Sequence, residues 1–332
     1  MKVSIRQQDI ARHLGVSLGT VSQALRNSPQ VSSEMRLEVQ RAATELGYIY
    51  RPRENQQTDM TNLAFISGAQ PNNFFYTGVL QGIEESCRER NITLHYSSLK
   101  DISQPDLQRY RANDGLLVAG YVDQRMVREL KNLGLPMVLV DTNLSHLGLE
   151  RIEIENFGST YQAVEYLAAA GHRNIAFLCA PPPSRFSSFD NRRGGYFSAM
   201  SDLGLEAFDI HGLTDPVLKT SEQVITRWLE QHGKPAFTAL VCCNDEAAIG
   251  ALLAFEHHGI QVPQDISIIG FDDIEMAQVV RPALTTFHVD RNFLGSLAVN
   301  QLVERFQQPD KPVASILLET SFVERASTRR LI

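Results

Sequence analysis

Hydroxyl and amide side chains gather in one short segment near the amino terminus. Ser17, Thr20 and Ser22 supply hydroxyl groups, and Gln23 supplies an amide. Hydroxyls and the free N–H groups at a helix start bind phosphates, and a glutamine can bond bidentately to adenine N6 and N7. Leu18 and Gly19 lie between them, where an apolar side chain can meet a thymine methyl and glycine leaves room. The segment therefore predicts a surface that reads duplex DNA, on which we also place Arg26.

The apolar residues around this segment predict a compact unit of three helices over residues 1–49. The first helix ends at Gly15, the second covers 17–26 with Val21 and Leu25 on one face, and the third opens at Ser32 or Ser33. Three helices with short turns in under fifty residues are typical of a helix-turn-helix domain. The alternative is an ordinary helical cap without a role in DNA binding.

A polar linker is predicted over residues 50–62, which hold almost no apolar residues. Arg51 and Arg53 lie in this linker, and we expect both to contact DNA phosphates.

The rest of the chain, residues 63–332, alternates short apolar runs with helical patterns. This alternation predicts doubly wound parallel sheets of an α/β protein, in two lobes with a ligand cleft at the carboxyl ends of the strands. The expected strands are 63–67, 93–97, 116–119, 137–141, 175–180, 239–243, 266–270 and 316–319. The expected helices include 76–90, 159–170, 193–203, 245–258 and 293–306.

The composition and the absence of certain motifs argue against enzymes, cofactor-binding proteins and membrane-spanning proteins. The sequence contains no GxGxxG, Walker loop, GxSxG or HExxH motif, so we expect neither an enzyme nor a bound cofactor or metal. No apolar run is long enough to span a membrane, and four cysteines without a CxxC pair indicate a reduced, cytoplasmic protein. Residues 1–60 have a net charge of +2 and the remainder −9, so any DNA contact is confined to the first region.

The chain resembles the LacI-type family of transcription regulators, and motifs along nearly its whole length show this in the right order. The motifs are Gly15-Val16-Ser17-x-x-Thr20-Val21-Ser22-x-x-Leu25, Val31-Ser32, Leu46-Gly47-Tyr48, Asn73-Phe74-Phe75, Gly82-Ile83, Ala170-Gly171-His172-Arg173-x-Ile175-Ala176, Arg192-x-x-Gly195-Tyr196, Cys243-Asn244-Asp245, Gly270-Phe271-Asp272-Asp273, Pro282-x-Leu284-Thr285-Thr286 and Arg325-x-Ser327-Thr328.

The resemblance implies a helix-turn-helix DNA-binding head, a hinge and a two-lobed core like the periplasmic sugar-binding proteins. It implies discontinuous lobes, an N-lobe of about 63–160 plus 291–320 and a C-lobe of about 161–290 plus 321–332. It also implies a homodimer on a near-palindromic DNA operator. The function expected is sequence-specific transcription regulation, as a repressor, under a small-molecule effector such as a sugar or sugar derivative. The alternative is a solute-binding protein of the periplasmic type without a DNA role.

The resemblance also assigns effector-binding residues. Arg192 is similar to the family's effector-clamping arginine, and Asn244 and Asp272 are similar to the partners of effector hydroxyls. A guanidinium, an amide and a carboxylate together suit a polyhydroxylated ligand. Phe74 and Phe75 are candidates to stack on a sugar ring, with one of them left to the core.

Three points stay open at this stage. One of Arg192 and Arg193 is expected to be merely solvated, and one of Asp272 and Asp273 to be a structural helix cap. The hinge departs from the family pattern, because Gln57 stands near the position where a leucine is expected to wedge into the minor groove.

Overall fold

The computed structural model describes residues 7–25, 31–46, 60–69, 73–99, 107–120, 122–180, 187–213 and 217–331. The chain divides into two compact units, Met1–Asp59 and Met60–Ile332. The predictions for Arg26, Arg51, Arg53 and the hinge residue Gln57 lie outside the described residues. Among the helices of the described part, none is long and apolar enough to cross a membrane.

The first unit contains the three helices that the sequence predicts: α1 (Gln7–Leu14), α2 (Leu18–Leu25) and α3 (Ser33–Glu45). Ile10, Val21, Ala24 and Val39 are fully buried between them, which explains the helical spacing of the apolar residues. Gly15 has a φ of +65°, a conformation that glycine adopts without strain, and it allows the chain to turn sharply between α1 and α2.

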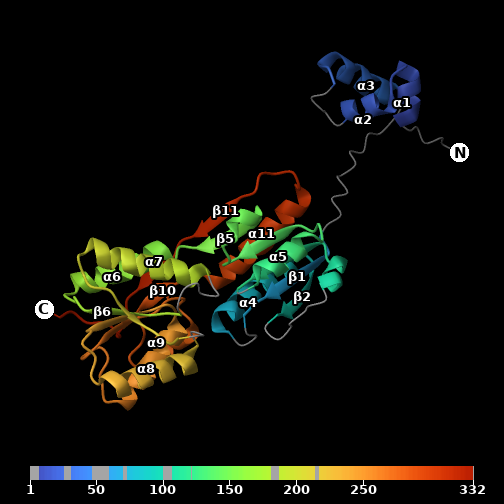
Figure 1. Cartoon of the computed structure of the whole chain (residues 1–332). Helices are drawn as coiled ribbons and strands as arrows, with labels where there is room; N and C mark the ends of the chain where they lie inside the picture. Colours follow the sequence, from blue (N-terminus) through green and yellow to red (C-terminus); the bar gives the residue numbers. More distant parts are fainter. Residues whose placement is uncertain are drawn as a thin grey trace. The chain divides into compact units, whose positions relative to one another are not determined.

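A six-stranded parallel sheet forms one part of the second unit, with strand order β11-β5-β4-β3-β1-β2 (Figure 1). We call this sheet and its helices the six-stranded lobe. Its strands are β1 (Asn62–Ser67), β2 (Thr93–Ser98), β3 (Gly115–Ala119), β4 (Met137–Val140), β5 (Glu150–Ile154) and β11 (Ser315–Leu318). Its helices are α4 (Phe74–Glu89), α5 (Gln124–Lys131), α11 (Arg291–Gln307) and the short 3₁₀ turns η1 (Leu107–Ala112) and η2 (Ser145–Leu147).

The strands at the centre of this sheet are apolar throughout because both faces are covered. In β1, Leu63 and Phe65 belong to one buried cluster and Ala64 and Ile66 to another. The first cluster includes residues of α4 and α11, and the second includes residues of α5. Helices on both faces are the arrangement expected of a parallel sheet.

A four-stranded parallel sheet, with strand order β7-β6-β8-β9, forms the other part of the second unit. We call this sheet, the helices that cover it and the adjoining antiparallel strand pair the four-stranded lobe. Its strands are β6 (Ile175–Leu178), β7 (Phe208–Ile210), β8 (Ala239–Cys242) and β9 (Ser267–Ile269). Its helices are α6 (Phe157–Ala169), α7 (Ser187–Asp202), α8 (Leu218–His232), α9 (Asp245–His257) and α10 (Glu275–Val279). An antiparallel pair, β10 (Thr286–His288) with β12 (Ser321–Val323), adjoins the end of β9. Thr285 bridges to Ile269 of β9, and His288 bridges to Asp272 beyond it.

The eight predicted strands all occur, and the predicted α/β class with doubly wound parallel sheets is confirmed. Four strands were not predicted. β5 reads Glu-Arg-Ile-Glu-Ile, so charged residues hide its apolar alternation, and β7, β10 and β12 have only three residues each. Such short strands depend on pairing partners that are distant in sequence.

We predict that the close packing of α7 on α6 makes two adjacent glycines respond oppositely to alanine. A Cβ at Gly195 would lie 2.2 Å from the carbonyl oxygen of Phe157, whereas one at Gly194 would lie 3.4 Å from the Phe157 ring. Gly195→Ala should therefore lower the free energy of unfolding by ~1–3 kcal/mol. Gly194→Ala should be neutral or stabilising by up to ~1 kcal/mol, because alanine favours the helix.

Urea unfolding followed by the fluorescence of Trp228, the one tryptophan of the chain, measures both effects in the same lobe. Equal stability of the two variants would contradict this account of the packing.

Candidate functional site

The start of α2 is capped by its own hydroxyl groups. Ser17 Oγ accepts a hydrogen bond from the backbone N–H of Thr20 at 3.0 Å and lies 2.8 Å from Thr20 Oγ1. Val21 is buried, whereas Ser17, Gly19 and Gln23 are exposed. The helix therefore has a buried face toward α1 and α3 and an exposed polar face.

The side chains of Leu18 and Ser22 lie outside the described residues, although their backbone belongs to α2. The exposed face therefore supports the predicted DNA contacts only through Ser17, Gly19, Thr20 and Gln23.

A cleft between the six-stranded and four-stranded lobes gathers polar side chains from both. Asp141, Asn244 and Asp272 directly or closely follow β4, β8 and β9, at the carboxyl ends where ligands bind in open parallel sheets. The space between these side chains is about 420 Å³, including the part open to solvent. The lining residues are Asn73, Phe75, Tyr76, Asp141, Ser188, Phe189, Arg192, Val217, Asn244 and Asp272.

Arg192 on α7 is almost completely buried, with 2% of its surface exposed. Its Nε donates to Asn156 Oδ1 at 2.7 Å, its Nη1 to the carbonyl oxygen of Cys243, and its Nη2 to Asp272 Oδ1 at 3.2 Å. The guanidinium also stacks 3.6 Å from the ring centre of Phe271. A buried charge needs such a set of partners, and here the protein itself supplies them.

Asp272 faces this guanidinium from a backbone conformation that is unusual for aspartate, with a φ of +109°. Burial raises the pKa of Asp272 to about 6, although Arg192 and Arg291 oppose the shift. Its neighbour Asp273 has a different role, since it accepts hydrogen bonds from Arg325 at 2.6 Å and His288 at 3.0 Å. Asp272 therefore belongs to the cleft and Asp273 to the internal support of the lobe.

Asp141 lies on the opposite wall and accepts a hydrogen bond from Tyr76 Oη at 3.0 Å. Burial raises the pKa of Asp141 to about 7, although Arg192 and the Tyr76 hydrogen bond lower it. Burial, followed by the charge of Asp141, also raises the pKa of Tyr76 well above its ordinary value, so Tyr76 stays a hydrogen-bond donor. The two carboxyl groups make the cleft rich in hydrogen-bond acceptors.

Two asparagines line the cleft as helix caps. Asn73 Oδ1 accepts the N–H of Tyr76 at 3.0 Å at the start of α4, and Asn244 Oδ1 accepts the N–H of Ala247 at 2.9 Å at the start of α9. Asn73 Nδ2 also lies 3.5 Å from Glu246 Oε2 of the other lobe. The caps hold these amides at the helix starts that face the cleft.

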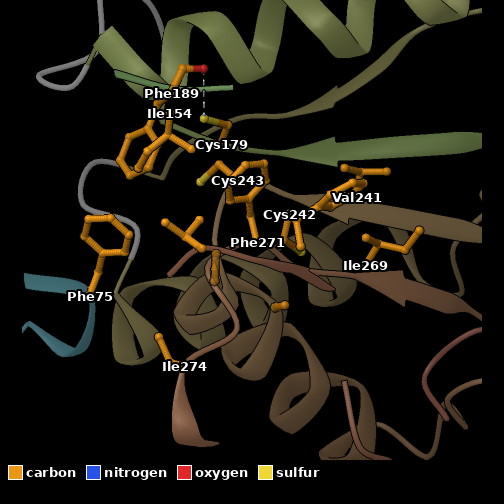
Figure 2. Packing of buried hydrophobic residues seen from close by; sticks show 14 of the residues in the cluster. Phe75, Ile154, Cys179, Phe189, Val241, Cys242, Cys243, Ile269, Phe271 and Ile274 are labelled. Carbon is orange, nitrogen blue, oxygen red and sulfur yellow. Dashed lines mark hydrogen bonds between the residues drawn. The ribbon is translucent and has the colours of Figure 1, made fainter. Parts of the chain in front are cut away.

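The back of the cleft is apolar. Figure 2 shows Phe75, Phe189 and Phe271 in the buried cluster that also contains Cys179 and Cys243. Burial raises the pKa of the Cys243 thiol well above its ordinary value, so this sulfur stays protonated. Within the described part of the chain, no group of His, Cys, Asp and Glu side chains is arranged to hold a metal ion.

Four of the five residues that the sequence placed at the effector site line this cleft: Phe75, Arg192, Asn244 and Asp272. Phe74 is not among the lining residues, and 41% of its surface is exposed.

The expectation that one of the two adjacent arginines is merely solvated is wrong. Arg193 is buried as well, where it pairs with Asp209 and donates to the carbonyl oxygen of Ala180 at 2.8 Å. The helix presents the two guanidinium groups to different internal partners.

Sequence reasoning missed six lining residues: Asn73, Tyr76, Asp141, Ser188, Phe189 and Val217. A signal for Asp141 was available, because it follows a buried apolar run as Asn244 does. Ser188, Phe189 and Val217 follow no comparable strand, and only the folded chain brings them to the cleft.

Comparisons with known proteins agree with this architecture. Residues 7–50 match the family described as bacterial regulatory proteins, lacI family, and residues 164–328 match a periplasmic binding protein-like domain. The chain is 31% identical to the ribose operon repressor of Haemophilus influenzae, over 96% of this chain and 97% of that protein.

Solved structures are similar over most of the chain. A LacI family transcriptional regulator from Enterococcus faecium with bound ribose is 25% identical, with a TM-score of 0.74 over 82% of this chain and 100% of that one. The lac repressor dimer bound to operator and the anti-inducer ONPF shares the fold, with 24% identity and a TM-score of 0.69 over 98% of this chain and 100% of that one.

We predict that Asp141→Asn changes how stability depends on pH. An aspartate in an unfolded chain has a pKa of about 3.9, and the folded protein raises that of Asp141 to about 7, so folding favours its protonated form. The free energy of unfolding of the wild type should therefore fall, relative to Asp141→Asn, as pH rises from about 4 to about 7, and the difference should level off above that.

Urea unfolding followed by circular dichroism across this range measures the difference, which we expect to exceed ~1 kcal/mol. Asp272 is present in both proteins, so its own titration largely cancels. Exposed Asp310→Asn is the control, and a profile for Asp141→Asn that parallels the wild type would contradict the prediction.

Proposed function

Because the chain belongs to the lacI family of bacterial regulatory proteins, we propose that it represses transcription by binding operator DNA under the control of an uncharged sugar. The observation on which this depends is that one chain contains both a three-helix head with an exposed polar helix face and a cleft lined by carboxyl and amide groups. A solute-binding protein would need only the cleft.

On the DNA side, α2 enters the major groove in this proposal. Its contacts with phosphates and base edges come from Ser17, Leu18, Gly19, Thr20, Ser22, Gln23 and Arg26, and the linker adds Arg51 and Arg53. The capped start of α2 supports this, because the hydrogen bond from Thr20 N to Ser17 Oγ holds the helix start in one conformation. Two such heads in a homodimer would read the two halves of a near-palindromic operator.

On the effector side, the proposed contacts are Asp141, Asp272, Asn73 and Asn244, with Phe75 against the apolar face of the ring. Carboxylate oxygens accept from hydroxyl groups, so the cleft favours a ligand with several O–H donors. The ribose bound in the Enterococcus faecium relative is such a ligand.

The role proposed for Arg192 differs from a simple clamp. All three of its nitrogens donate to protein acceptors, so its guanidinium positions Asp272 rather than binding an effector anion. Asp272 offsets the charge of Arg192, and the remaining carboxyl group of Asp141 would repel a phosphorylated sugar or a sugar acid. We therefore assign the effector to the uncharged sugars.

The remaining assignments follow from this function. In this proposal the two lobes close on the effector and change the distance between the two linkers. The N-lobe is about 63–160 plus 291–320, and the C-lobe is about 161–290 plus 321–332.

The relatives are transcription regulators rather than enzymes, and we propose no catalysis here. A protein that binds promoter DNA acts in the cytoplasm, where we place it.

We predict that Gln23→Ala weakens binding to the operator selected by the wild-type chain from a random pool of duplexes. The loss should be about tenfold, because one bidentate base contact contributes ~1–3 kcal/mol of discrimination, and the base preference should relax at one symmetric position. Fluorescence anisotropy with the operator and with scrambled duplex measures both. An equal loss on the two duplexes would show that Gln23 reads no base.

We also predict that the uncharged member of a pair of related ligands binds, whereas its anionic counterpart does not. Thermal unfolding of the full-length chain is measured with matched pairs such as D-ribose and ribose 5-phosphate, D-glucose and glucuronate, and adenosine and AMP. At a ligand concentration about 100-fold above its Kd, binding adds ~2.7 kcal/mol to stability, so a neutral ligand should raise Tm by several degrees. Stabilisation by an anionic member alone would contradict the assignment of an uncharged effector.

A further inference from the structure

The point where the linker joins the six-stranded lobe is held by an unusual set of hydrogen bonds. Asp114 Oδ2 accepts from the backbone N–H of Thr61 at 2.7 Å, from Thr61 Oγ1 at 3.0 Å and from the backbone N–H of Asn62 at 2.9 Å. In return, the N–H of Asp114 donates to the carbonyl oxygen of Asn62 at 2.8 Å. One carboxylate oxygen thus takes three donors from the first residues of the second unit.

The neighbouring strand holds the same residues from the other side. The N–H of Thr93 donates to the carbonyl oxygen of Thr61 at 2.7 Å, and β1 pairs with β2 from Asn62 and Thr93 onward. The backbone of Thr61 and Asn62 is therefore fixed between β2 and the residue that precedes β3. Burial would raise the pKa of Asp114, but the bonds from Thr61 and Asn62 lower it overall, which keeps the carboxylate ionised.

The buried side chain of Met60 adds a hydrophobic contact at the same place. Met60 is 5% exposed and belongs to the buried cluster of the sheet. It fits because Gly115, next to Asp114, has no side chain: a Cβ there would lie 2.9 Å from Met60 Cε and 3.0 Å from Leu302 Cδ2. Asp114 thus accepts hydrogen bonds from the backbone of Thr61 and Asn62, and Gly115 leaves space for the side chain of Met60.

The helix that contributes Leu302 to the cluster around Met60 also reaches the other lobe. Leu302 lies in α11, and Arg291 at the start of the same helix donates to Glu275 Oε1 of the four-stranded lobe at 3.0 Å. The two positions are eleven residues apart, or ~16 Å along a helix. One helix, α11, therefore extends from a contact between the lobes to the buried cluster that contains Met60.

We propose that Asp114, Gly115 and Met60 form an anchor that fixes the end of the linker on the six-stranded lobe and thereby sets the half-site spacing that two DNA-binding heads accept. Asp114 is a positioning residue, since it lies outside the cleft lining and acts through its hydrogen bonds to Thr61 and Asn62. The proposal rests on the proposed function, because only a DNA-binding dimer has a half-site spacing. The physical reason is that a tether with a fixed end gives a narrow distribution of distances and a high effective concentration of the second head.

The test measures operator spacing with the full-length chain. Three duplexes are used: the selected operator, the same operator with about two base pairs added between its half-sites, and a single half-site. For the wild type we expect the added spacing to weaken binding by about tenfold. Asp114→Ala should reduce this penalty to about threefold or less, while its affinity for the single half-site stays within about twofold of the wild type.

Two variants and a matched control separate the anchor from general stability. Asp114→Asn keeps an acceptor oxygen without the charge, so its spacing penalty should fall between those of the wild type and Asp114→Ala. If Asp114→Ala does not fold, the comparison of Asp114→Asn with the wild type decides the question. Asp265→Ala is the control, because Asp265 also accepts a backbone N–H, from Gln261 at 2.9 Å, but lies in the four-stranded lobe. It should leave the spacing penalty unchanged.

Amide hydrogen exchange gives a readout without DNA. The amides of Thr61 and Asn62 should exchange faster in Asp114→Ala than in the wild type, whereas those at the centre of β3 should not. An unchanged exchange rate, an unchanged spacing penalty, or an equal change in Asp265→Ala would overturn the anchor. A wild type that prefers no duplex over scrambled DNA would instead contradict the proposed function itself.

Discussion

The buried guanidinium of Arg192 is the interaction on which the cleft depends. A charge with 2% exposure must be matched on every side, and its acceptors are Asn156 after β5, the carbonyl oxygen of Cys243 after β8 and Asp272 after β9. Three chain segments far apart in sequence must therefore meet for the charge to be tolerated. The same requirement holds Asp272 in its unusual backbone conformation, facing the cleft rather than solvent.

The cleft lining has two carboxyl groups and one guanidinium, so Arg192 offsets the charge of only one of the two carboxyl groups. Asp141 and Asp272 both have a raised pKa because burial penalises their charged forms. A ligand that donates hydroxyl groups replaces the lost solvation of these carboxylates, which favours their ionised state. The proposed recognition of a polyhydroxylated ligand and the predicted pH dependence of stability thus have one physical origin.

The two lobes touch near the cleft through polar contacts, among them Arg291 with Glu275, Asn73 with Glu246, and Asn143 with Ser187. Polar contacts of this kind rearrange at a small cost, so a ligand bound to both walls can shift the balance between open and closed arrangements. Helix α11 begins at one of these contacts, and its residue Leu302 belongs to the same buried cluster as Met60.

Features that depend on local pattern were determined by the sequence alone: the three helices of the head and eight of the strands. The effector-site assignments of Asn244 and Asp272 came instead from the resemblance of their motifs to those of a known family. Apolar periodicity and the glycine and proline residues that end helices and strands act over a few residues. They can therefore be recognised without knowing which distant segments pack against them. Only the tertiary structure decided that Arg193 is buried, that Phe74 lies outside the cleft lining and that Asp141 lies within it. Burial and hydrogen-bond partners come from segments that are distant in sequence. The acceptors of Arg192 lie 36, 51 and 80 residues away along the chain, and no local pattern encodes which segments will meet.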